Sequence, residues 1–434
     1  PYVQLVAARF MELHPDVKVV IQPTPFGQMV QTALTALQNK NPDPALIIFY
    51  PSQASTLGPY LMNLKPYFDK GVFNESDIPE TTLLSVYVVQ NNTVVKIFGV
   101  PFQQVFGYVL IYRKSIIYNP QLQQEFKQRY GYDLDPETWS SWDQLITAAR
   151  FIQSAINNGT IKGPKYALLF PDGLQQAIFN GFIGVFYTYA INDPCVALPV
   201  TQGAVPTQGY WAYFKLLPNG TINITIGCPS FVQALRTYKQ LVQFQPPIDV
   251  QAMEYDQLRD LFLTGDYVMV AAWTSFLPIY NNASLSKVAG DLGVAPLPGG
   301  RFPLATGQAP TFIGINPNYP DPDLAAQFIA LMISPQMYKL GAERVGFVPA
   351  TISGLEAAAS VPTMSWLRPF IPLLQQAKAT DLTRLTLINR ITNFFTDLRP
   401  VFINQVADYL RGKQNAETTQ QNILTAWRQL MKIS

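Results

Sequence analysis

Charged residues are scarce in this sequence. Lys, Arg, Asp and Glu make up 13% of its 434 residues, whereas ordinary soluble domains contain about 25%. The 30 basic and 28 acidic residues nearly balance, at a net charge of +2, so neither nucleic acid nor an anionic membrane is an obvious partner. Uncharged polar side chains must therefore cover much of the surface. Such a surface suits either an assembly that buries it or an acidic environment, in which carboxylates lose their charge.

Histidine and cysteine are almost absent. The one histidine, His14, and the two cysteines, Cys195 and Cys228, cannot supply a usual metal ligand set or a His-based catalytic triad. Phosphate loops, dinucleotide fingerprints, zinc-protease helices and Gly-x-Ser-x-Gly elbows are missing as well. The sequence therefore predicts no cofactor, no metal and no enzyme. The acidic residues alone leave a glycosidase open, since that chemistry needs only two carboxylates.

Apolar runs long enough to span a bilayer are also missing. The longest, 178–191, contains Asn180, Gly181 and Gly184, which favours a buried helix. No signal peptide is present, and the sequence starts directly in a helical pattern, so we expect further residues before it. Six Asn-X-Ser/Thr sequons favour an exported glycoprotein. Their asparagines are Asn74, Asn91, Asn158, Asn219, Asn223 and Asn282.

In an exported chain we expect Cys195 and Cys228 to pair. The disulfide would close a loop of about 34 residues and stabilise the fold by roughly 3–4 kcal/mol in the chain-entropy model. The stretch 192–229 would then hold an edge hairpin, because residues 220–226 alternate β-branched and polar side chains. Two separate buried thiols are the alternative.

The stretch 99–114 organises the chain. Its residues 108–112 are all apolar or aromatic, which predicts a strand buried on both faces. Gln103 and Gln104 precede that strand, where we expect the strands to open into a cleft between two lobes. Before it, predicted helices (3–13 and 26–39) alternate with predicted strands (17–22 and 44–50), a pattern that indicates a mainly parallel sheet.

Several weak motifs occur in a constant order along almost the whole chain. Their order and spacing resemble the family 1 extracellular solute-binding proteins, which feed ABC importers. The most specific match is Phe-x-x-Gly-x-x-x-Met, a strand and then Trp, at Phe262, Gly265, Met269 and Trp273. The others are Pro101 with Tyr112 and Lys114, Thr138-Trp139 with Trp142-Asp143, Gly346-x-x-Pro349, and Gly412 before the last helix.

The resemblance implies an α/β fold of the two-lobed, type II periplasmic-binding-protein kind, with hinged lobes, a ligand cleft and a helical C-terminal region. The first lobe would hold residues 1–110 and 290–335. The second would hold 111–289 and 336–434, including the disulfide-tied hairpin. Members of that family usually carry another strand before the helix that corresponds to residues 3–13.

The resemblance also implies a ligand site at strand ends, and carbohydrate stacking on Trp273, whose indole offers a wide apolar face to a sugar ring. A core role for Trp273 stays open, as does an ordinary polar loop at residues 50–53. Asp172 would either cap the helix that follows it or accept a ligand hydroxyl. The predicted ligand-binding residues are Tyr50, Ser52, Gln53, Gln103, Gln104, Asp172, Trp273, Gln308, Trp366 and Phe395.

These residues are almost all uncharged, which favours a neutral solute. The expected function is therefore extracellular capture of an oligosaccharide and its delivery to the permease subunits of an ABC importer. The protein would be held at the membrane by an anchor outside this sequence. The scarcity of charge suits an archaeal or thermoacidophilic source. A surface structural or assembly protein that reuses the same fold is the alternative.

Overall fold

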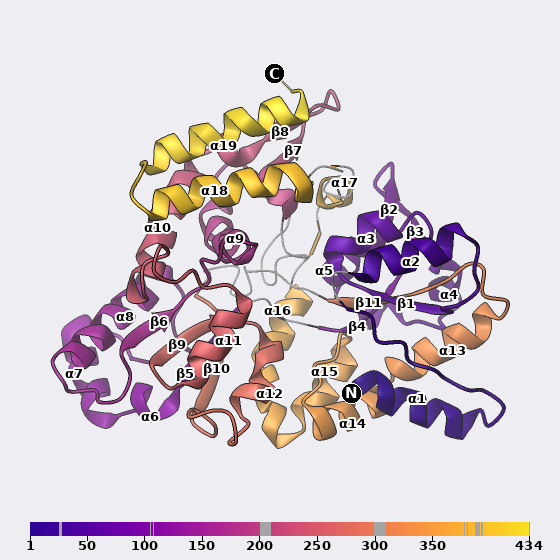
Figure 1. Cartoon of the computed structure of the whole chain (residues 1–434), viewed down its shortest axis with the longest axis horizontal. Helices are drawn as coiled ribbons and strands as arrows, with labels where there is room; N and C mark the ends of the chain where they lie inside the picture. The colour runs from indigo at the N-terminus through magenta and orange to yellow at the C-terminus, as the bar shows by residue number, and fades with distance from the viewer. Residues whose placement is uncertain are drawn as a thin grey trace. The chain divides into compact units, whose positions relative to one another are not determined.

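The chain forms two compact units that are joined three times. The computed structural model describes residues 1–433 except 26, 27, 105, 107, 200–209, 299–309, 377, 380, 387–390, 392 and 393. Unit 1 comprises Pro1–Val105 and Gln308–Arg390, and unit 2 comprises Phe106–Gly307 and Ile391–Ser434. Each unit combines a sheet with helices (Figure 1), as the α/β fold class predicted from the sequence requires.

Unit 1 is built around a small sheet of three strands. Its described strands are β1 (Leu46–Phe49), β2 (Tyr87–Gln90), β3 (Thr93–Ile97), β4 (Val100–Gln103) and β11 (Thr311–Ile315). Its helices of five or more residues are α1 (Tyr2–Leu13), α2 (Met29–Gln38), α3 (Pro51–Leu57), α4 (Lys65–Asp69), α13 (Pro322–Met332), α14 (Pro335–Val345), α15 (Ile352–Ala359), η8 (Pro362–Leu367) and α16 (Phe370–Gln376). Shorter helical turns include α5 (Glu80–Leu83) and α17 (Leu382–Leu385).

The strand order of this sheet is β1-β11-β4, and both pairings are antiparallel. Strands β1 and β4 therefore run in the same direction on either side of β11, and their carboxyl ends lie at one edge. Phe312 pairs with Phe49 at that edge, and Thr311 pairs with Gln103. β2 and β3 form a separate hairpin.

Unit 2 contains the larger sheet and the two last helices. Its strands are β5 (Val109–Arg113), β6 (Tyr166–Leu169), β7 (Phe214–Leu216), β8 (Ile222–Ile224), β9 (Tyr267–Ala272) and β10 (Leu292–Ala295). Its helices of five or more residues are α7 (Pro120–Tyr130), α8 (Trp142–Asn157), α9 (Ala177–Ala190), α10 (Pro229–Leu241), α11 (Tyr255–Leu263), the π-helix η10 (Phe394–Leu398), α18 (Arg399–Leu410) and α19 (Ala416–Met431). Shorter turns include α6 (Lys114–Ile117), η7 (Thr274–Phe276) and α12 (Leu277–Tyr280).

The main sheet of unit 2 has the order β10-β5-β9-β6. β5 is antiparallel to both of its neighbours, whereas β6 and β9 are parallel. All of β9 is buried, as are the first four residues of β5. The prediction of a strand buried on both faces at residues 108–112 is therefore confirmed for β5, which spans 109–113.

Helix α9 lies in the centre of unit 2. Its phenylalanines Phe179 and Phe182 both contact Phe402 of α18, with ring centroids 4.7 and 5.3 Å apart. Most of its other side chains are also buried. The sequence prediction of a buried helix at 178–191 is confirmed, and among the described residues no helix is long and apolar enough to cross a membrane.

The predicted hairpin and disulfide are both present in unit 2. β7 and β8 pair as an antiparallel hairpin, and a disulfide joins Cys195 to Cys228 with their Cα atoms 5.8 Å apart. Asp193 reinforces the same junction, because its carboxylate accepts hydrogen bonds from the backbone N–H groups of Cys195 and Ser230 at 2.9 and 3.0 Å. The start of α10 is thus tied to the segment that follows α9.

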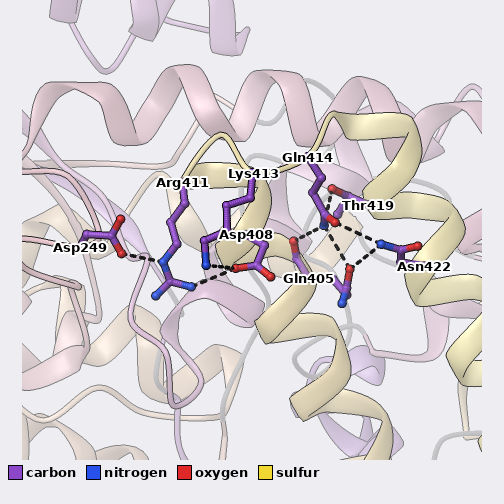
Figure 2. Close-up of polar contacts among 8 residues, drawn as sticks. All are labelled: Asp249, Gln405, Asp408, Arg411, Lys413, Gln414, Thr419 and Asn422. Carbon is purple, nitrogen blue, oxygen red and sulfur yellow. Dashed lines mark hydrogen bonds and ion pairs between the residues drawn. The ribbon is translucent and has the colours of Figure 1, made fainter.

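The helical C-terminal region ends in a hairpin of α18 and α19, which lie side by side (Figure 1). Figure 2 shows two polar clusters on this hairpin. One is ionic: Arg411 contacts both Asp249 (2.6 Å) and Asp408 (3.3 Å), and Lys413 contacts Asp408 (3.1 Å). The other is uncharged and consists of Gln405, Gln414, Thr419 and Asn422.

In the uncharged cluster, the amide of Gln414 donates to the side-chain oxygens of Gln405 and Thr419 at 3.1 and 3.0 Å. The Asn422 amide donates to Gln405 and Gln414 at 2.9 and 3.1 Å. Amide hydrogen bonds do not depend on ionised groups. The hairpin is therefore closed by contacts that acid leaves in place.

The boundaries of the two units differ from the predicted lobes. Residues 336–390 belong to unit 1, although the sequence placed them in the second lobe. Residues 106–110 and 290–307 belong to unit 2, although the sequence placed them in the first lobe. Local pairing explains these differences. β10 pairs with β5 in the unit 2 sheet, whereas Pro349, after α14, forms a β-bridge with Gln103 of unit 1.

Two secondary-structure predictions were wrong. Residues 17–22 form no strand; no described strand pairs with them, and Val20 is 65% exposed. The sheets are also mainly antiparallel rather than parallel. Parallel order follows when a helix returns the chain to the same sheet. Here β4 and β5, which follow one another along the chain, belong to sheets in different units.

Removing the disulfide should destabilise unit 2 while leaving the fold recognisable. The bond joins residues 33 positions apart, and in the chain-entropy model the loss should be roughly 3–4 kcal/mol. Denaturant unfolding of the Cys195→Ser/Cys228→Ser double variant should show this loss relative to the oxidised parent. Peptide mapping without reductant is the control, and two freely alkylated thiols in the native protein would contradict the pairing.

Candidate functional site

Strand direction gathers a set of polar and aromatic residues at one edge of the unit 2 sheet. β6 and β9 are parallel, so their carboxyl ends meet there, and antiparallel β5 begins at the same edge. Trp273 follows β9, Tyr108 precedes β5, and the loop 170–176 follows β6. Ligands commonly bind at such carboxyl ends in α/β sheets.

Three aromatic rings cluster at this edge. The Trp273 ring lies 5.2 Å from the Tyr108 ring and meets the Tyr255 ring edge-on at 5.7 Å. Tyr108 is fully buried, whereas Trp273 and Tyr255 are half-buried. Asn180, in the first turn of α9, donates a hydrogen bond to the Tyr255 hydroxyl, and burial raises the pKa of that phenol.

The backbone next to Trp273 is held firmly. The Phe106 N–H donates to Thr274 Oγ1 at 3.2 Å, and the Thr274 N–H donates to the Phe106 carbonyl at 3.3 Å. The indole N–H of Trp273 has no acceptor among the described residues. A half-buried indole on a fixed backbone offers apolar surface for stacking and an N–H group that can donate to a ligand oxygen.

Hydrogen bonds join the loop 170–176 to the segment that contains Met253 and Glu254. The N–H groups of Asp172 and Gly173 donate to the Met253 carbonyl at 3.2 and 3.0 Å. The Asp172 carboxyl accepts from the Met253 N–H at 2.6 Å. Gly173 permits this approach, because a Cβ at this position would lie 2.5 Å from the Cα of Glu254.

Glu254 caps α9 from this position. Its carboxylate accepts hydrogen bonds from the backbone N–H groups of residues 175, 176 and 177, at 3.0–3.4 Å. A carboxylate is stabilised at a helix N-terminus by these donors and by the helix dipole. Since Tyr255 follows Glu254 directly, the cap also fixes the position of a site residue.

Asp172 does not take the predicted capping role, and its burial argues against contact with a ligand hydroxyl. Glu254, not Asp172, satisfies the first N–H groups of α9, and Asp172 is only 1% exposed. Asp172 is therefore a buried residue that joins the loop 170–176 to the segment containing Met253. Burial raises the pKa of the Asp172 carboxyl from 3.8 to about 7, although the Met253 N–H works in the opposite direction.

Phe395 and Arg399 extend the unit 2 site along the start of α18. The Arg399 guanidinium lies 5.2 Å from the centroid of the Phe395 ring, and its Nη1 donates to the Gln176 side-chain oxygen at 3.4 Å. Gln176 immediately precedes α9, one turn before Asn180. The positive charge of Arg399 also lowers the pKa of Tyr255 slightly, against the stronger effect of burial.

In unit 1 the structure brings together the predicted residues that follow β1 and β4. Tyr50 begins the turn after β1, and Gln103 ends β4 at the same sheet edge, with Thr311 of β11 between them. The Thr311 hydroxyl donates to Gln103 Oε1 at 3.4 Å. Ser52 is half-buried in the first turn of α3. Contact of these residues with a ligand stays a prediction.

The remaining predicted residues have structural surroundings or lie elsewhere. The Gln53 side chain is 6% exposed and accepts from the Tyr50 N–H at 3.1 Å, which closes the first turn of α3. Gln104 is 1% exposed, and its N–H donates to the Val348 carbonyl at 3.0 Å. Trp366 is half-buried in unit 1 against Phe370. Gln308 lies outside the described residues.

The ligand-binding residues predicted from the sequence do not include Asn180, Gln176, Glu254, Tyr255 or Arg399. Glu254 and Tyr255 come from a segment about 80 residues after the loop they meet, so no local pattern connects them. The described residues contain no group of three or more His, Cys, Asp or Glu side chains that could hold a metal ion.

Comparison with known proteins agrees with this architecture. Residues 1–339 match the family described as bacterial extracellular solute-binding protein, which is more than half of the chain. No sequence among the curated proteins matches. The chain therefore belongs to the family of bacterial extracellular solute-binding proteins.

Solved structures share the fold at low sequence identity. Maltose-bound MalE3 of T. maritima is 21% identical, with a TM-score of 0.65 over 99% of this chain and 96% of that one. The GacH receptor of Streptomyces glaucescens, studied with acarbose, is 18% identical, with a TM-score of 0.65 over 99% and 95%. The substrate-binding protein Lmo0181 of Listeria monocytogenes, in complex with cycloalternan, is 14% identical, with a TM-score of 0.65 over 100% and 96%. The fold is thus that of two-lobed periplasmic binding proteins.

The buried Asp172 should make the protein more stable in acid than at neutral pH. A carboxyl whose folded pKa is about 7 prefers the neutral form, so its share of stability is complete below the unfolded pKa, near 4. That share is lost as the pH rises to 7. The loss should be on the order of 4 kcal/mol, since each pKa unit corresponds to about 1.4 kcal/mol.

Asp172→Asn should remove this slope, because the amide keeps an oxygen for the Met253 N–H but carries no charge. Denaturant unfolding at pH 4, 6 and 8 measures the difference. Asp133→Asn is the matched control at an exposed position and should leave the pH profile unchanged. An Asp172→Asn profile that parallels the parent would contradict the assignment.

Proposed function

We propose that this protein captures a neutral oligosaccharide outside the cell and delivers it to an ABC importer. The observation that carries the proposal is the half-buried Trp273, held between Tyr108 and Tyr255 at the carboxyl edge of the unit 2 sheet. Sugar rings present C–H faces that stack on an indole. Amide groups such as that of the half-buried Gln176 suit sugar hydroxyls because they both donate and accept.

The family and its structural neighbours support this choice of ligand. The neighbours were studied with maltose, acarbose and cycloalternan, and another with maltotetraose. The proposed role is binding without catalysis. The cleft expected from the sequence, contact of the solute with Tyr50, Ser52 and Gln103, and a membrane anchor outside residues 1–434 are parts of the same proposal.

A saccharide that binds should stabilise the fold. At a concentration of 100 times its Kd, a ligand adds about 2.7 kcal/mol, which thermal unfolding detects easily. Maltose, maltotetraose and cycloalternan are the first probes. If none of them shifts the melting temperature, while the protein polymerises as its concentration rises, the assembly role would replace the binding role.

Trp273→Ala should weaken saccharide binding at least tenfold, which corresponds to about 1.4 kcal/mol, with little change in the melting temperature of the free protein. Calorimetric titration measures the affinity. Phe276→Ala is the matched control, since Phe276 is a half-buried aromatic residue three positions further on that contacts Tyr280 instead of the site. Equal losses in the two variants would mean that Trp273 acts through local structure.

We also propose that the six sequon asparagines carry glycans in the exported protein. All six are exposed: Asn74, Asn91, Asn158, Asn219, Asn223 and Asn282. At Asn74, Asn219 and Asn282, the side-chain oxygen accepts a hydrogen bond of 2.7 Å from the sequon hydroxyl. Family membership, which places the protein outside the cytoplasm, supports the proposal.

Intact mass spectrometry of protein from its native source should show glycan mass at these positions. Peptide mapping before and after chemical deglycosylation locates each modified asparagine. Asn180, which is 4% exposed and lies outside any sequon, serves as an unmodified internal control. Unmodified peptides at all six sequons would refute the proposal.

A further inference from the structure

Three asparagines in this chain are followed directly by glycine: Asn158, Asn180 and Asn219. Such a pair is chemically reactive, because the backbone nitrogen of the glycine can attack the side-chain carbonyl carbon of the asparagine. Glycine permits the attack, since it has no Cβ beside that nitrogen and its backbone turns freely. The structure places the three pairs in different surroundings, and these surroundings decide where the reaction can occur.

Asn219 lies in the turn between β7 and β8. The Gly220 N–H donates to the Leu217 carbonyl at 2.9 Å, and Gly220 adopts a positive φ of 81°. Asn219 and Gly220 are both exposed, and a Cβ at Gly220 would meet no described atom within 4 Å. Water and base therefore reach the reacting atoms, and the turn has room to move.

Two donors act on the side-chain oxygen of Asn219. Its Oδ1 accepts from the backbone N–H and the hydroxyl of Thr221, at 3.1 and 2.7 Å. These hydrogen bonds fold the side chain over the peptide groups that follow it. When the Gly220 nitrogen bonds to Cγ, negative charge develops on Oδ1, and donors that are already in place stabilise that charge. The threonine that completes the sequon thus also activates the amide.

The other two asparagines show how the surroundings change the reaction. Asn158 is exposed at the end of α8, and its Oδ1 accepts from the Thr160 N–H at 3.0 Å; no described hydroxyl donates to it. Asn180 is only 4% exposed, inside α9. Gly181 is packed closely, since a Cβ there would lie 2.7 Å from the ring of Pro171. A packed helical backbone cannot bring the nitrogen onto Cγ, so Asn180 should stay intact.

We propose that Asn219, and more slowly Asn158, convert spontaneously to aspartate and isoaspartate when they carry no glycan. In the first step the Gly220 nitrogen loses its proton and bonds to Asn219 Cγ. The Cγ–Nδ2 bond breaks and ammonia leaves, which closes a five-membered imide. Water then adds to either imide carbonyl and opens the ring. In sum, a water molecule is consumed and an ammonia molecule is released, with no oxidant or reductant.

The reaction competes with glycosylation, since both use Nδ2 of the same asparagine. A glycan on Nδ2 replaces ammonia by a bulky glycosylamine as the leaving group, and so protects the turn. A converted residue has no amide left to accept a glycan, and it adds a negative charge to a chain that has few charges. The inference goes beyond the proposed saccharide capture and does not depend on it.

The test incubates the folded full chain, made in a host that does not glycosylate it, at pH 8 and at pH 4. Peptide mapping should detect the mass gain of aspartate over asparagine, and a separately eluting isoaspartyl peptide, first at Asn219 and later at Asn158. Conversion should be much slower at pH 4, because the attacking nitrogen must lose its proton. Asn180 has the same glycine neighbour and is the internal control. Digestion under mildly acidic conditions prevents further conversion during mapping.

Asn282 supplies a matched comparison. It is exposed, and its Oδ1 accepts from the Ser284 N–H and hydroxyl at 3.0 and 2.7 Å, but alanine follows it. Ala283→Gly should raise the rate of conversion at Asn282 roughly tenfold, because glycine lacks the Cβ that hinders the attack. Thr221→Val should slow conversion at Asn219 about threefold or more, since Oδ1 loses one of its two donors.

Three results would overturn the inference: an unchanged Asn219 in the folded, unglycosylated protein, conversion of Asn180 as fast as that of Asn219, or an Ala283→Gly variant whose Asn282 reacts no faster than the parent's. A Thr221→Val variant that reacts as fast as the parent would overturn the activating role of the threonine. Failure of the saccharide probes leaves all these outcomes unaffected, because none of them involves a ligand.

Discussion

The capping of α9 by Glu254 is the constraint on which unit 2 depends. The first turn of this helix is buried against aromatic side chains, so its N–H groups cannot rely on water, and leaving them without acceptors would cost free energy. A carboxylate from a distant segment satisfies them. The same segment carries Tyr255, so one electrostatic contact sets both the start of the central helix and one wall of the candidate site.

Charged side chains are few in this protein, and only a small number of them lie at the candidate site. Most ion pairs of the described residues involve exposed side chains, and such pairs contribute little to stability. The charged or titratable groups at the site are few: the Glu254 carboxylate at the start of α9, the buried Asp172 between two loops and the Arg399 guanidinium beside Gln176. Amides, hydroxyls and aromatic rings make up the rest, which suits the recognition of uncharged polar ligands.

Much of the fold was predictable because its signals are local. The signals for three features depend on nearby residues or on simple chemistry. These features are the apolar run at 108–112, the start of α8, where Ser141 and Gln144 form a capping box, and the cysteine pair. The direction of the strands was not predictable in this way, because it depends on where the chain crosses from one unit to the other.

The candidate site likewise combines residues that have a local sequence signal with residues that meet only in the folded chain. Trp273 could be identified from a motif, and its position after a buried strand was foreseen. Glu254 and Arg399 could not, because each acquires its role only when residues far apart in sequence meet at the start of α9. Asp172 was recognised as a residue of interest, but its neighbours, and hence its role, come from a loop some 80 residues away.

The three crossings between units also govern how the protein can be made. Neither unit is a continuous stretch of chain, so a ribosome releases no complete unit early. Phe179 and Phe182 of α9 are synthesised more than 200 residues before Phe402, whose ring contacts both of them. Until α18 emerges, the apolar surface that α18 contacts is exposed to other chains, and such exposure promotes aggregation. Efficient production should therefore depend on chaperones that hold the chain until its last helices arrive.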